Sequence, residues 1–468
     1  MDFLSETKTI QLLKRKLPQI FSFPVNLPKF GGEHIEWSAE TTRIMNLMPG
    51  QGIFHTGIES SDPFAEGVRR NQLKEAHDFY TNFEQRLERI AGLGIKWLRF
   101  GVPYSTAHLG PGQYDFDFFE KVLRKCEQLG ITILADLLHF GLPEWLHAED
   151  TLRPFFQNPK FPEHFADYVE SFAKRFPEIK FYTLVNEPFV TANFSAKMGV
   201  WNEAKPNPDW HDDREFVQAI ANIAKAAILA RERLEQVWFS ERRTDKGQEL
   251  IFIQNESFEA AVASPGSHRE EEAYQFNLRR FAALDLIFGK RDLGMKRYLL
   301  SQGMTPADYE WFMLNGQTSK TILGIDHYPW CVYYLDREGQ EIEPLERYQL
   351  YELSKVYYDR YRMPLLHTEI NGLPELAVSL CDKTYDALVR LRNEGYPVCG
   401  MGWYGDEYQV GWQNVMIGDT RHSEYPVGLF YKGELQPVAS LFNELASKGL
   451  TVSKQPGIVS KLRRIFHI

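Results

Sequence analysis

The sequence predicts a single (β/α)8 barrel, in which a β-strand and an α-helix alternate eight times. Short apolar segments recur along the chain, and segments with apolar residues at three- and four-residue spacing separate them. This regular alternation indicates a parallel sheet, and eight strands are the number that closes a barrel. An open, doubly wound sheet is the alternative, but no glycine-rich phosphate-binding turn follows the first expected strand.

Eight segments have the composition of buried parallel strands. Each is a short run of branched and aromatic residues, as in strands that helices cover. In the fourth of them, FYTLVNEP, Pro188 marks the point where strand pairing must stop. The expected strands are residues 52–60, 95–104, 131–140, 181–188, 249–257, 321–330, 363–370 and 396–405.

The intervening segments have the period of one helix face. Glycines stop the first two of these helices, at Gly92 and Gly94 and then at Gly130. The fourth is a long alanine-rich segment. The expected helices lie within residues 73–90, 119–129, 165–176, 214–236, 273–289, 346–362, 375–395 and 438–449.

These elements divide the chain into three parts. Residues 51–450 are expected to form the barrel, which is one domain despite its length because barrels often reach this size. Residues 1–50, with several prolines and Gly31–Gly32, are expected to be an N-terminal extension packed on the outside or the bottom of the barrel. Residues 451–468 are expected to be a basic C-terminal tail, KLRRIFH at its core.

The composition excludes several classes of function. A formal net charge of −10 argues against nucleic acid as a partner. The cysteines lie far apart and the histidines do not cluster, so we expect no metal or cofactor. We expect the cysteines to be buried free thiols in a reducing compartment. No secretory leader and no bilayer-spanning segment is evident, and these features predict a soluble, cytoplasmic protein of unknown oligomeric state.

Two of the expected strands end in a glutamate. Asn186 and Glu187 end the fourth strand, and Glu369 ends the seventh. Catalytic residues of such barrels lie at the C-terminal ends of the strands, where a pair of carboxyl groups is typical of glycosidases. A solvated strand end would explain either glutamate alone, but the pair favours an active site. Other polar and aromatic residues at these ends are Glu59, Arg99, Tyr104, His139, Asn255, Glu256, Asp326, His327, Tyr328 and Trp403.

The motifs around these residues resemble those of clan A glycoside hydrolases, and most closely family 1, the β-glucosidase-like group. LVNEP at 184–188 is similar to the TFNEP of that family, and LLHTEING at 365–372 is similar to its ITENG. LLHFGLPEWL at 137–146 resembles its YHWDLP segment, and LGIDHYPW at 323–330 resembles its GINYY segment. The resemblance runs from about residue 50 to residue 447 and implies a TIM barrel.

The resemblance also implies the roles of individual residues in a retaining β-glycosidase. Glu369 would be the nucleophile, and Glu187 would be the acid and then the base. Arg99 would keep Glu369 ionised, and Tyr328 would donate to the same carboxylate, although His327 competes for this role. The other implied substrate-binding residues are Asn186 at the sugar 2-hydroxyl, His139, Glu59, and Trp403 as the floor of the glycone subsite.

The chain also departs from the family pattern. Gly57 stands where the family has a glutamine that binds the sugar, and Asp326 and His327 replace its asparagine and aromatic residue. The glycone-binding glutamate after Trp403 has no clear match, because Asp406, Glu407 and Gln409 all lie at shifted spacing; Glu407 is the candidate selected.

The leading functional hypothesis is hydrolysis of small β-glycosides, with the glycoside as the expected partner and no cofactor. A transglycosylase using the same site is the first alternative. A non-catalytic barrel that binds saccharide or scaffolds a partner is the second, but it would leave the two glutamates unexplained.

Overall fold

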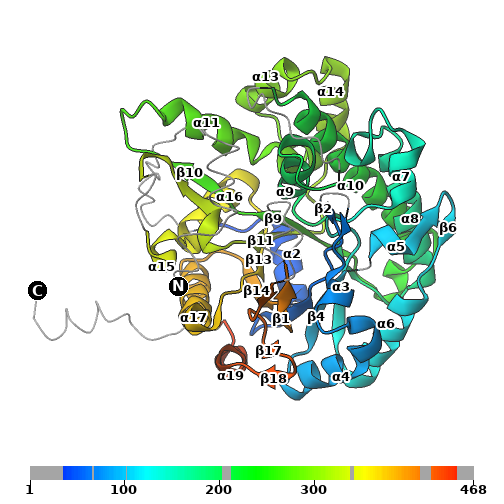
Figure 1. The fold of residues 1–468 in the computed structure, drawn as a ribbon, viewed down its shortest axis with the longest axis vertical. Coiled ribbons are helices and arrows are strands. Elements are labelled where there is room, and N and C mark those ends of the chain that lie inside the picture. The colour runs from blue at the N-terminus through cyan, green and yellow to red at the C-terminus, as the bar shows by residue number, and fades with distance from the viewer. Residues whose placement is uncertain are drawn as a thin grey trace, which may run out of the picture.

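The computed structural model describes residues 35–65, 68–101, 103–202, 212–337, 342–411 and 423–450. Eight parallel strands close into a barrel surrounded by helices, which confirms the predicted fold class (Figure 1). Each barrel strand pairs with the next one along the chain, and the last pairs with the first, with Ile53 opposite Gly400. The barrel strands are β1 (Ile53–Ile58), β4 (Trp97–Gly101), β7 (Thr132–Asp136), β8 (Phe181–Thr183), β9 (Ile251–Ser257), β11 (Thr321–Asp326), β13 (Leu365–Glu369) and β14 (Val398–Tyr404).

Helices occur in all eight predicted segments, but the segments 73–90, 273–289 and 346–362 are each divided into two helices. The segment expected to form one helix over residues 273–289 is divided into α11 (Glu270–Arg279) and α12 (Ala282–Ile287). This break allows Asp285 of α12 to accept hydrogen bonds from Arg360 and Tyr361. The other outer helices are α4 (Phe79–Gly92), α6 (Asp117–Leu129), α8 (Phe161–Arg175), α10 (Arg214–Ser240), α16 (Leu350–Tyr361), α17 (Pro374–Asn393) and α19 (Pro437–Lys448).

Additional helices and short strand pairs lie in the loops. Among the helices are α3 (Gln72–Glu75), α5 (Tyr104–Ala107), α7 (Glu144–Glu149), α9 (Pro188–Ala192), α13 (Leu293–Ser301), α14 (Pro306–Asn315) and α15 (Pro344–Arg347). The paired strands are β2 (Phe64–Ala65) with β3 (Val68–Arg69), β5 (His108–Gly110) with β6 (Gln113–Tyr114), β10 (Ala260–Val262) with β12 (Val332–Tyr334), β15 (Gln409–Val410) with β16 (Glu424–Tyr425), and β17 (Phe430–Tyr431) with β18 (Glu434–Leu435).

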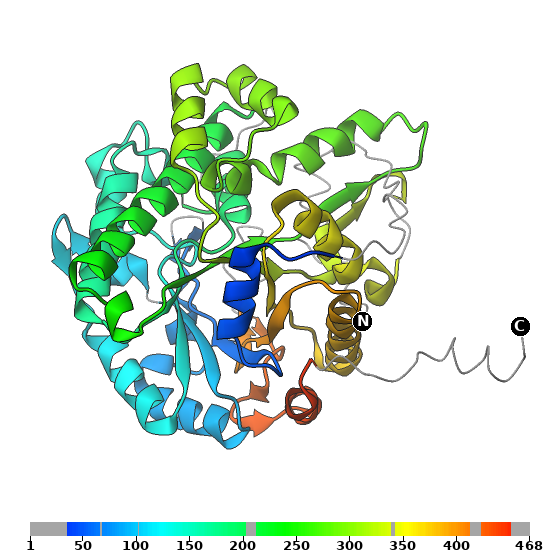
Figure 2. The ribbon, with the colours of Figure 1, turned by 180° about the vertical axis from the view of Figure 1, so that it is seen from behind.

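An apolar cluster fills the N-terminal end of the barrel. Helix α2 (Ala39–Leu47) lies across this end and contributes Ile44, while Met48 follows it (Figure 2). The inward-facing side chains that pack against them are Ile53, Leu134, Ile251, Ile253, Ile322, Leu366 and Cys399. Because this end is closed by apolar residues, a polar site is confined to the opposite, C-terminal end of the strands. Residues 1–34 and the predicted tail at 451–468 lie outside the described residues.

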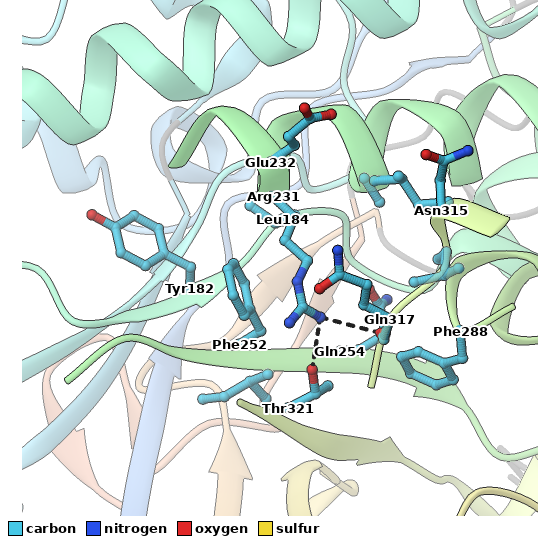
Figure 3. Close-up of a pocket in the computed structure, with 14 residues that line it drawn as sticks. Tyr182, Leu184, Arg231, Glu232, Phe252, Gln254, Phe288, Asn315, Gln317 and Thr321 are labelled. Carbon is cyan, nitrogen blue, oxygen red and sulfur yellow. Dashed lines mark hydrogen bonds between the residues drawn. The ribbon is translucent and has the colours of Figure 1, made fainter. Parts of the chain in front are cut away.

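A cavity of about 220 Å³ lies between α10 and the outer face of the barrel (Figure 3). Arg231 of α10 projects into it and donates to the carbonyl of Gln317 at 3.2 Å and to Thr321 Oγ1 at 3.1 Å. Thr321 is the first residue of β11, so the cavity lies near the start of this strand rather than near its polar end. These contacts indicate that Arg231 connects the helical layer to the barrel.

Two further observations concern the cysteines and the lengths of the helices. Cys126, Cys331, Cys381 and Cys399 are all buried free thiols. Within the described ranges, no helix is long and apolar enough to cross a membrane.

Candidate active site

Glu187 and Glu369 face each other at the C-terminal end of the barrel. Glu369 is the last residue of β13, and Glu187 immediately precedes α9. Strand β8 ends at Thr183, earlier than predicted, because the chain turns there and Glu187 adopts a left-handed conformation with φ of 38°. A carboxylate oxygen of Glu187 lies within 4.8 Å of one of Glu369. Oxygens this close are compatible with the short separation of about 5–5.5 Å between the carboxyl groups of retaining glycosidases and not with the wider separation of about 6.5–9.5 Å in inverting enzymes.

Two donors hold the Glu369 carboxylate. Arg99 of β4 donates from Nη1 to Oε1, and the Tyr328 hydroxyl donates to Oε2 at 2.9 Å. His327 does not compete for this role, because its Nδ1 lies 2.7 Å from the carbonyl of Phe258 and its Nε2 accepts from the backbone of Gln349. Both oxygens of Glu369 are therefore oriented by charged or polar donors.

Glu187 has a different environment. Burial, together with the charges of Asp326 and Glu369, raises the pKa of Glu187 well above its usual range. Its side chain is only 7% exposed. Burial thus favours the protonated form of Glu187, whereas Arg99 and Tyr328 donate hydrogen bonds to Glu369. An acid and a nucleophile need such different environments.

A hydrogen-bond network extends from Arg99 along one side of the site. Arg99 Nη2 donates to Asp136 Oδ2 at 2.6 Å and to Asn186 Oδ1 at 2.5 Å. His139 Nδ1 lies 2.9 Å from the same Asp136 oxygen, and Asn186 Nδ2 lies 3.2 Å from His139 Nε2. Asp136, which the sequence did not single out, thus orients both a cation and an imidazole.

Glu59 continues this network beyond His139. Its Oε1 lies 3.6 Å from His139 Nε2 and accepts from the backbone of Ser61 at 3.0 Å. Its Oε2 accepts from Gln409 Nε2 at 3.0 Å. Burial raises the pKa of Glu59, and the Glu369 charge adds to this effect. Glu59, His139 and Gln409 therefore form a polar wall next to Glu187 and Glu369.

The expectation that Glu407 belongs to this wall is wrong. Its Oε1 accepts from His77 at 3.0 Å, from Arg89 at 2.8 Å and from the backbone of Gly433 at 3.0 Å. These contacts direct Glu407 toward α4 and place Gln409 in the site instead. Asp406, the third candidate, is held in a bidentate ion pair with Arg86 of α4.

The expectation that Trp403 forms the floor of the site is also wrong. Its neighbour Tyr404 faces inward: the ring lies 5.2 Å from the Arg99 guanidinium and stacks on His139 at 6.1 Å. Because successive side chains of a strand point to opposite faces, Trp403 points outward, and its Nε1 donates to the carbonyl of Val427. The Tyr404 ring lies directly over Gly57, its partner on β1.

Three more buried acids surround Glu187. Asp326 ends β11, and burial with the Glu369 charge raises its pKa to about 8. Glu256 accepts from the backbone amides of Phe189 and Ser257, and burial raises its pKa well above its usual range. Burial also raises the pKa of Glu259 to about 7. The sequence placed Asp326 and Glu256 at strand ends but gave neither a role.

One set of side chains in the described residues has the proximity that a shared cation would need. It consists of Glu187, Asp326 and Glu369, whose oxygens lie within 4.8 Å of one another. Arg99 and Tyr328 already donate to the two oxygens of Glu369. The arrangement is therefore better suited to holding and transferring a proton than to binding a metal.

Comparison with known proteins gives a consistent family. The model described as "Glycosyl hydrolase family 1" matches residues 57–386. The 6-phospho-beta-galactosidases of Staphylococcus aureus strains JH9 and Newman are each 30% identical over 116 residues, which are 24% of this chain and 24% of each relative. The matched segment thus spans about a quarter of the length of these relatives.

Solved structures show the same fold over most of the chain. The beta-glucosidase from Thermotoga maritima in complex with deoxynojirimycin has a TM-score of 0.65 and 14% identity, covering 86% of this chain and 98% of that one. The complex of that enzyme with castanospermine has a TM-score of 0.66 and 14% identity, covering 87% and 99%. At this level of identity the likeness concerns the fold.

Proposed function

Because the chain belongs to glycosyl hydrolase family 1, we propose that it is a retaining β-glycosidase that hydrolyses small β-glycosides by double displacement. The observation that carries this proposal is the geometry of the catalytic pair. Carboxylate oxygens of Glu187 and Glu369 lie within 4.8 Å of each other, and Arg99 and Tyr328 donate to Glu369.

In the first step of the proposed mechanism, a Glu369 oxygen attacks the anomeric carbon of the glycoside. The bond from this carbon to the leaving oxygen breaks, and that oxygen takes the proton of Glu187. The products are a glycosyl ester on Glu369, a free alcohol and an ionised Glu187. In the second step Glu187 accepts a proton from water, whose oxygen attacks the anomeric carbon and releases Glu369.

The polar wall would hold the sugar during both steps. Asn186 lies next to Glu187 and is oriented by Arg99, so its amide is available to the hydroxyl adjacent to the reacting carbon. His139, Glu59 and Gln409 would bind hydroxyls further along the ring. The Tyr404 ring lies beside them and would pack against the apolar face of the sugar.

The relatives suggest two classes of donor sugar for testing. The solved neighbours are beta-glucosidases, and the partial relatives are 6-phospho-beta-galactosidases. We therefore expect hydrolysis of β-glucosides or β-galactosides, with or without a 6-phosphate. A transglycosylase would use the same residues, and product analysis with added acceptor alcohols distinguishes the two reactions.

The test is intact-protein mass spectrometry after incubation with activated 2-deoxy-2-fluoro β-glycosides of these sugars. Such compounds trap the glycosyl-enzyme, and we expect one adduct, which peptide mapping places on Glu369. Glu369→Ala should remove both the adduct and the turnover of an aryl β-glycoside. Turnover that survives in Glu369→Ala would refute the mechanism, and a protein that neither binds covalently nor turns over any donor would indicate a non-catalytic barrel.

A further inference from the structure

A third carboxyl group lies beside the catalytic pair and has no part in the mechanism described above. Asp326 is fully buried, and one of its oxygens lies within 4.8 Å of the Glu187 and Glu369 oxygens. The register of β11 against β13 shifts between Ile325 and Asp326, which places Asp326 opposite Glu369. Such irregularities redirect side chains near active sites.

The structure stabilises the anion of Asp326 better than the anion of Glu187. Thr368 Oγ1 donates to Asp326 Oδ1 at 2.6 Å, and Asn255 Nδ2 lies 3.4 Å from both Asp326 oxygens. The Thr183 hydroxyl donates to the side-chain oxygen Oδ1 of Asn255 at 2.9 Å. The side-chain NH2 group of Asn255 therefore faces Asp326. In the part of the chain that the structure describes, no hydrogen-bond donor reaches the Glu187 carboxyl.

We propose that Asp326 is a positioning residue that ionises before Glu187 and, by charge repulsion, keeps the catalytic proton on Glu187 toward alkaline pH. This inference rests on the proposed function and extends it. Two carboxyl groups this close do not ionise independently, and the one with the better donors loses its proton first. Burial and the neighbouring charges raise the pKa of both groups, in agreement with such a shared titration.

Other charged groups face the same space, and their arrangement supports this order. Glu369 repels both groups but is held by Arg99, which also attracts Asp326. Glu256 and Glu259 repel Glu187 less strongly than Asp326 does, and the Tyr328 hydroxyl is directed to Glu369. Asp326 is therefore the neighbour whose charge acts most on Glu187.

The proton movements balance within the two steps of hydrolysis. Above about pH 8, where Asp326 is ionised, Glu187 gives its proton to the leaving oxygen and becomes ionised beside the Asp326 carboxylate. The repulsion between them makes Glu187 a stronger base, which takes a proton from the attacking water and returns to its starting state. Asp326 keeps its charge throughout and exchanges no proton with the substrate.

The test compares Asp326→Asn with the unmodified protein in the pH dependence of kcat/KM. For an alkyl β-glycoside, whose leaving group needs a proton, the alkaline limb should move to lower pH by about one unit. For a 2,4-dinitrophenyl β-glycoside, whose leaving group needs none, the limb should move much less. A merely structural role would lower both activities without this difference.

Two further variants keep the test decisive. Thr368→Val removes a donor from Asp326, so Asp326 keeps its proton longer and the limb should move in the same direction by a smaller amount. Glu259→Gln is the matched control, since it removes a buried carboxyl whose charge acts more weakly on Glu187. An unchanged limb in Asp326→Asn, or an equal shift in Glu259→Gln, would overturn the inference.

A measurement without substrate separates this inference from the proposed function. Infrared pH-difference spectra of the unliganded protein detect protonated carboxyl groups, and the band missing in Glu187→Gln belongs to Glu187. In Asp326→Asn this band should disappear at lower pH than in the unmodified protein. That result would support the proton relationship even if no glycoside were hydrolysed, and an unmoved band would refute it even if the hydrolase activity were confirmed.

Discussion

Gly57→Ala should disturb the site through a single contact. A Cβ atom at position 57 would lie well inside 3.0 Å of the Tyr404 ring, a separation that real Cβ atoms do not show. The ring cannot retreat freely, because it stacks on His139 and lies against Arg99. Overpacking of this kind costs about 1–3 kcal/mol of unfolding free energy. Displacement of Tyr404 should also lower kcat/KM, since Arg99 and His139 both belong to the site.

The assay is a double-mutant cycle with Tyr404→Ala, which removes the ring. In that background Gly57→Ala should cost close to nothing, so the coupling between the two positions should approach the full 1–3 kcal/mol, roughly the cost of the clash. Gly50→Ala is the control, because its Cβ would meet no atom within 4 Å. Effects of Gly57→Ala and Tyr404→Ala that add within about 0.5 kcal/mol would refute the inward placement of Tyr404.

Three other predictions test the site. Arg99→Met leaves Asp136 and Glu369 without their cation and should cost about 3–5 kcal/mol of stability, as well as most of kcat; a variant that unfolds like the unmodified protein would contradict this. Gln409→Ala should raise KM or lower kcat with little loss of stability, while Glu407→Gln should mainly lower the melting temperature; the reverse pattern would restore Glu407 to the site. Glu259 has a pKa of about 7 in the fold, so its stabilising effect is present below about pH 4.5 and is lost as the pH rises through 7. Between pH 5 and pH 8, the free energy of unfolding of Glu259→Gln should therefore rise by about 2–3 kcal/mol relative to that of the unmodified protein, as measured by denaturation curves at the two pH values. A difference in unfolding free energy that is the same at both pH values would contradict the raised pKa.

The fold could be predicted from the sequence because the hydrophobic periodicity of the chain distinguishes the alternating strands and helices of such a barrel. All eight predicted strands contain an observed barrel strand, and their order follows from sequential pairing. The end of β8 could not be predicted in the same way. Leu184 and Val185 have the composition of a strand, but the chain has to turn there so that Pro188 can begin α9.

The proximity of Glu187 and Glu369 was also predictable, because both glutamates follow buried strands whose C-terminal ends meet at one end of a barrel. The errors arose where one position decides the face of a strand. Trp403 and Tyr404 are adjacent aromatic residues, and composition does not say which of them points inward, although a shift of one residue exchanges the two faces. The error at Glu407 has a similar cause. Asp406, Glu407 and Gln409 are all polar residues of the loop after β14, and the sequence does not say which of them faces the site. Arg86 and Arg89 of α4 bind Asp406 and Glu407, which leaves Gln409 to face the site.

These positions are physically coupled, and the coupling explains the departures from the family pattern. The Tyr404 ring occupies the volume that any side chain at position 57 would need, so a glutamine there is excluded while Tyr404 faces inward. In the proposed mechanism, polar contacts to the sugar would then come from Glu59 and Gln409, which are hydrogen-bonded to each other. Restoring a glutamine at position 57 alone should therefore damage the site, and a change of glycone preference should require simultaneous replacement of Tyr404. The contacts around position 57 thus form a mutually dependent set that a comparison of single positions does not detect.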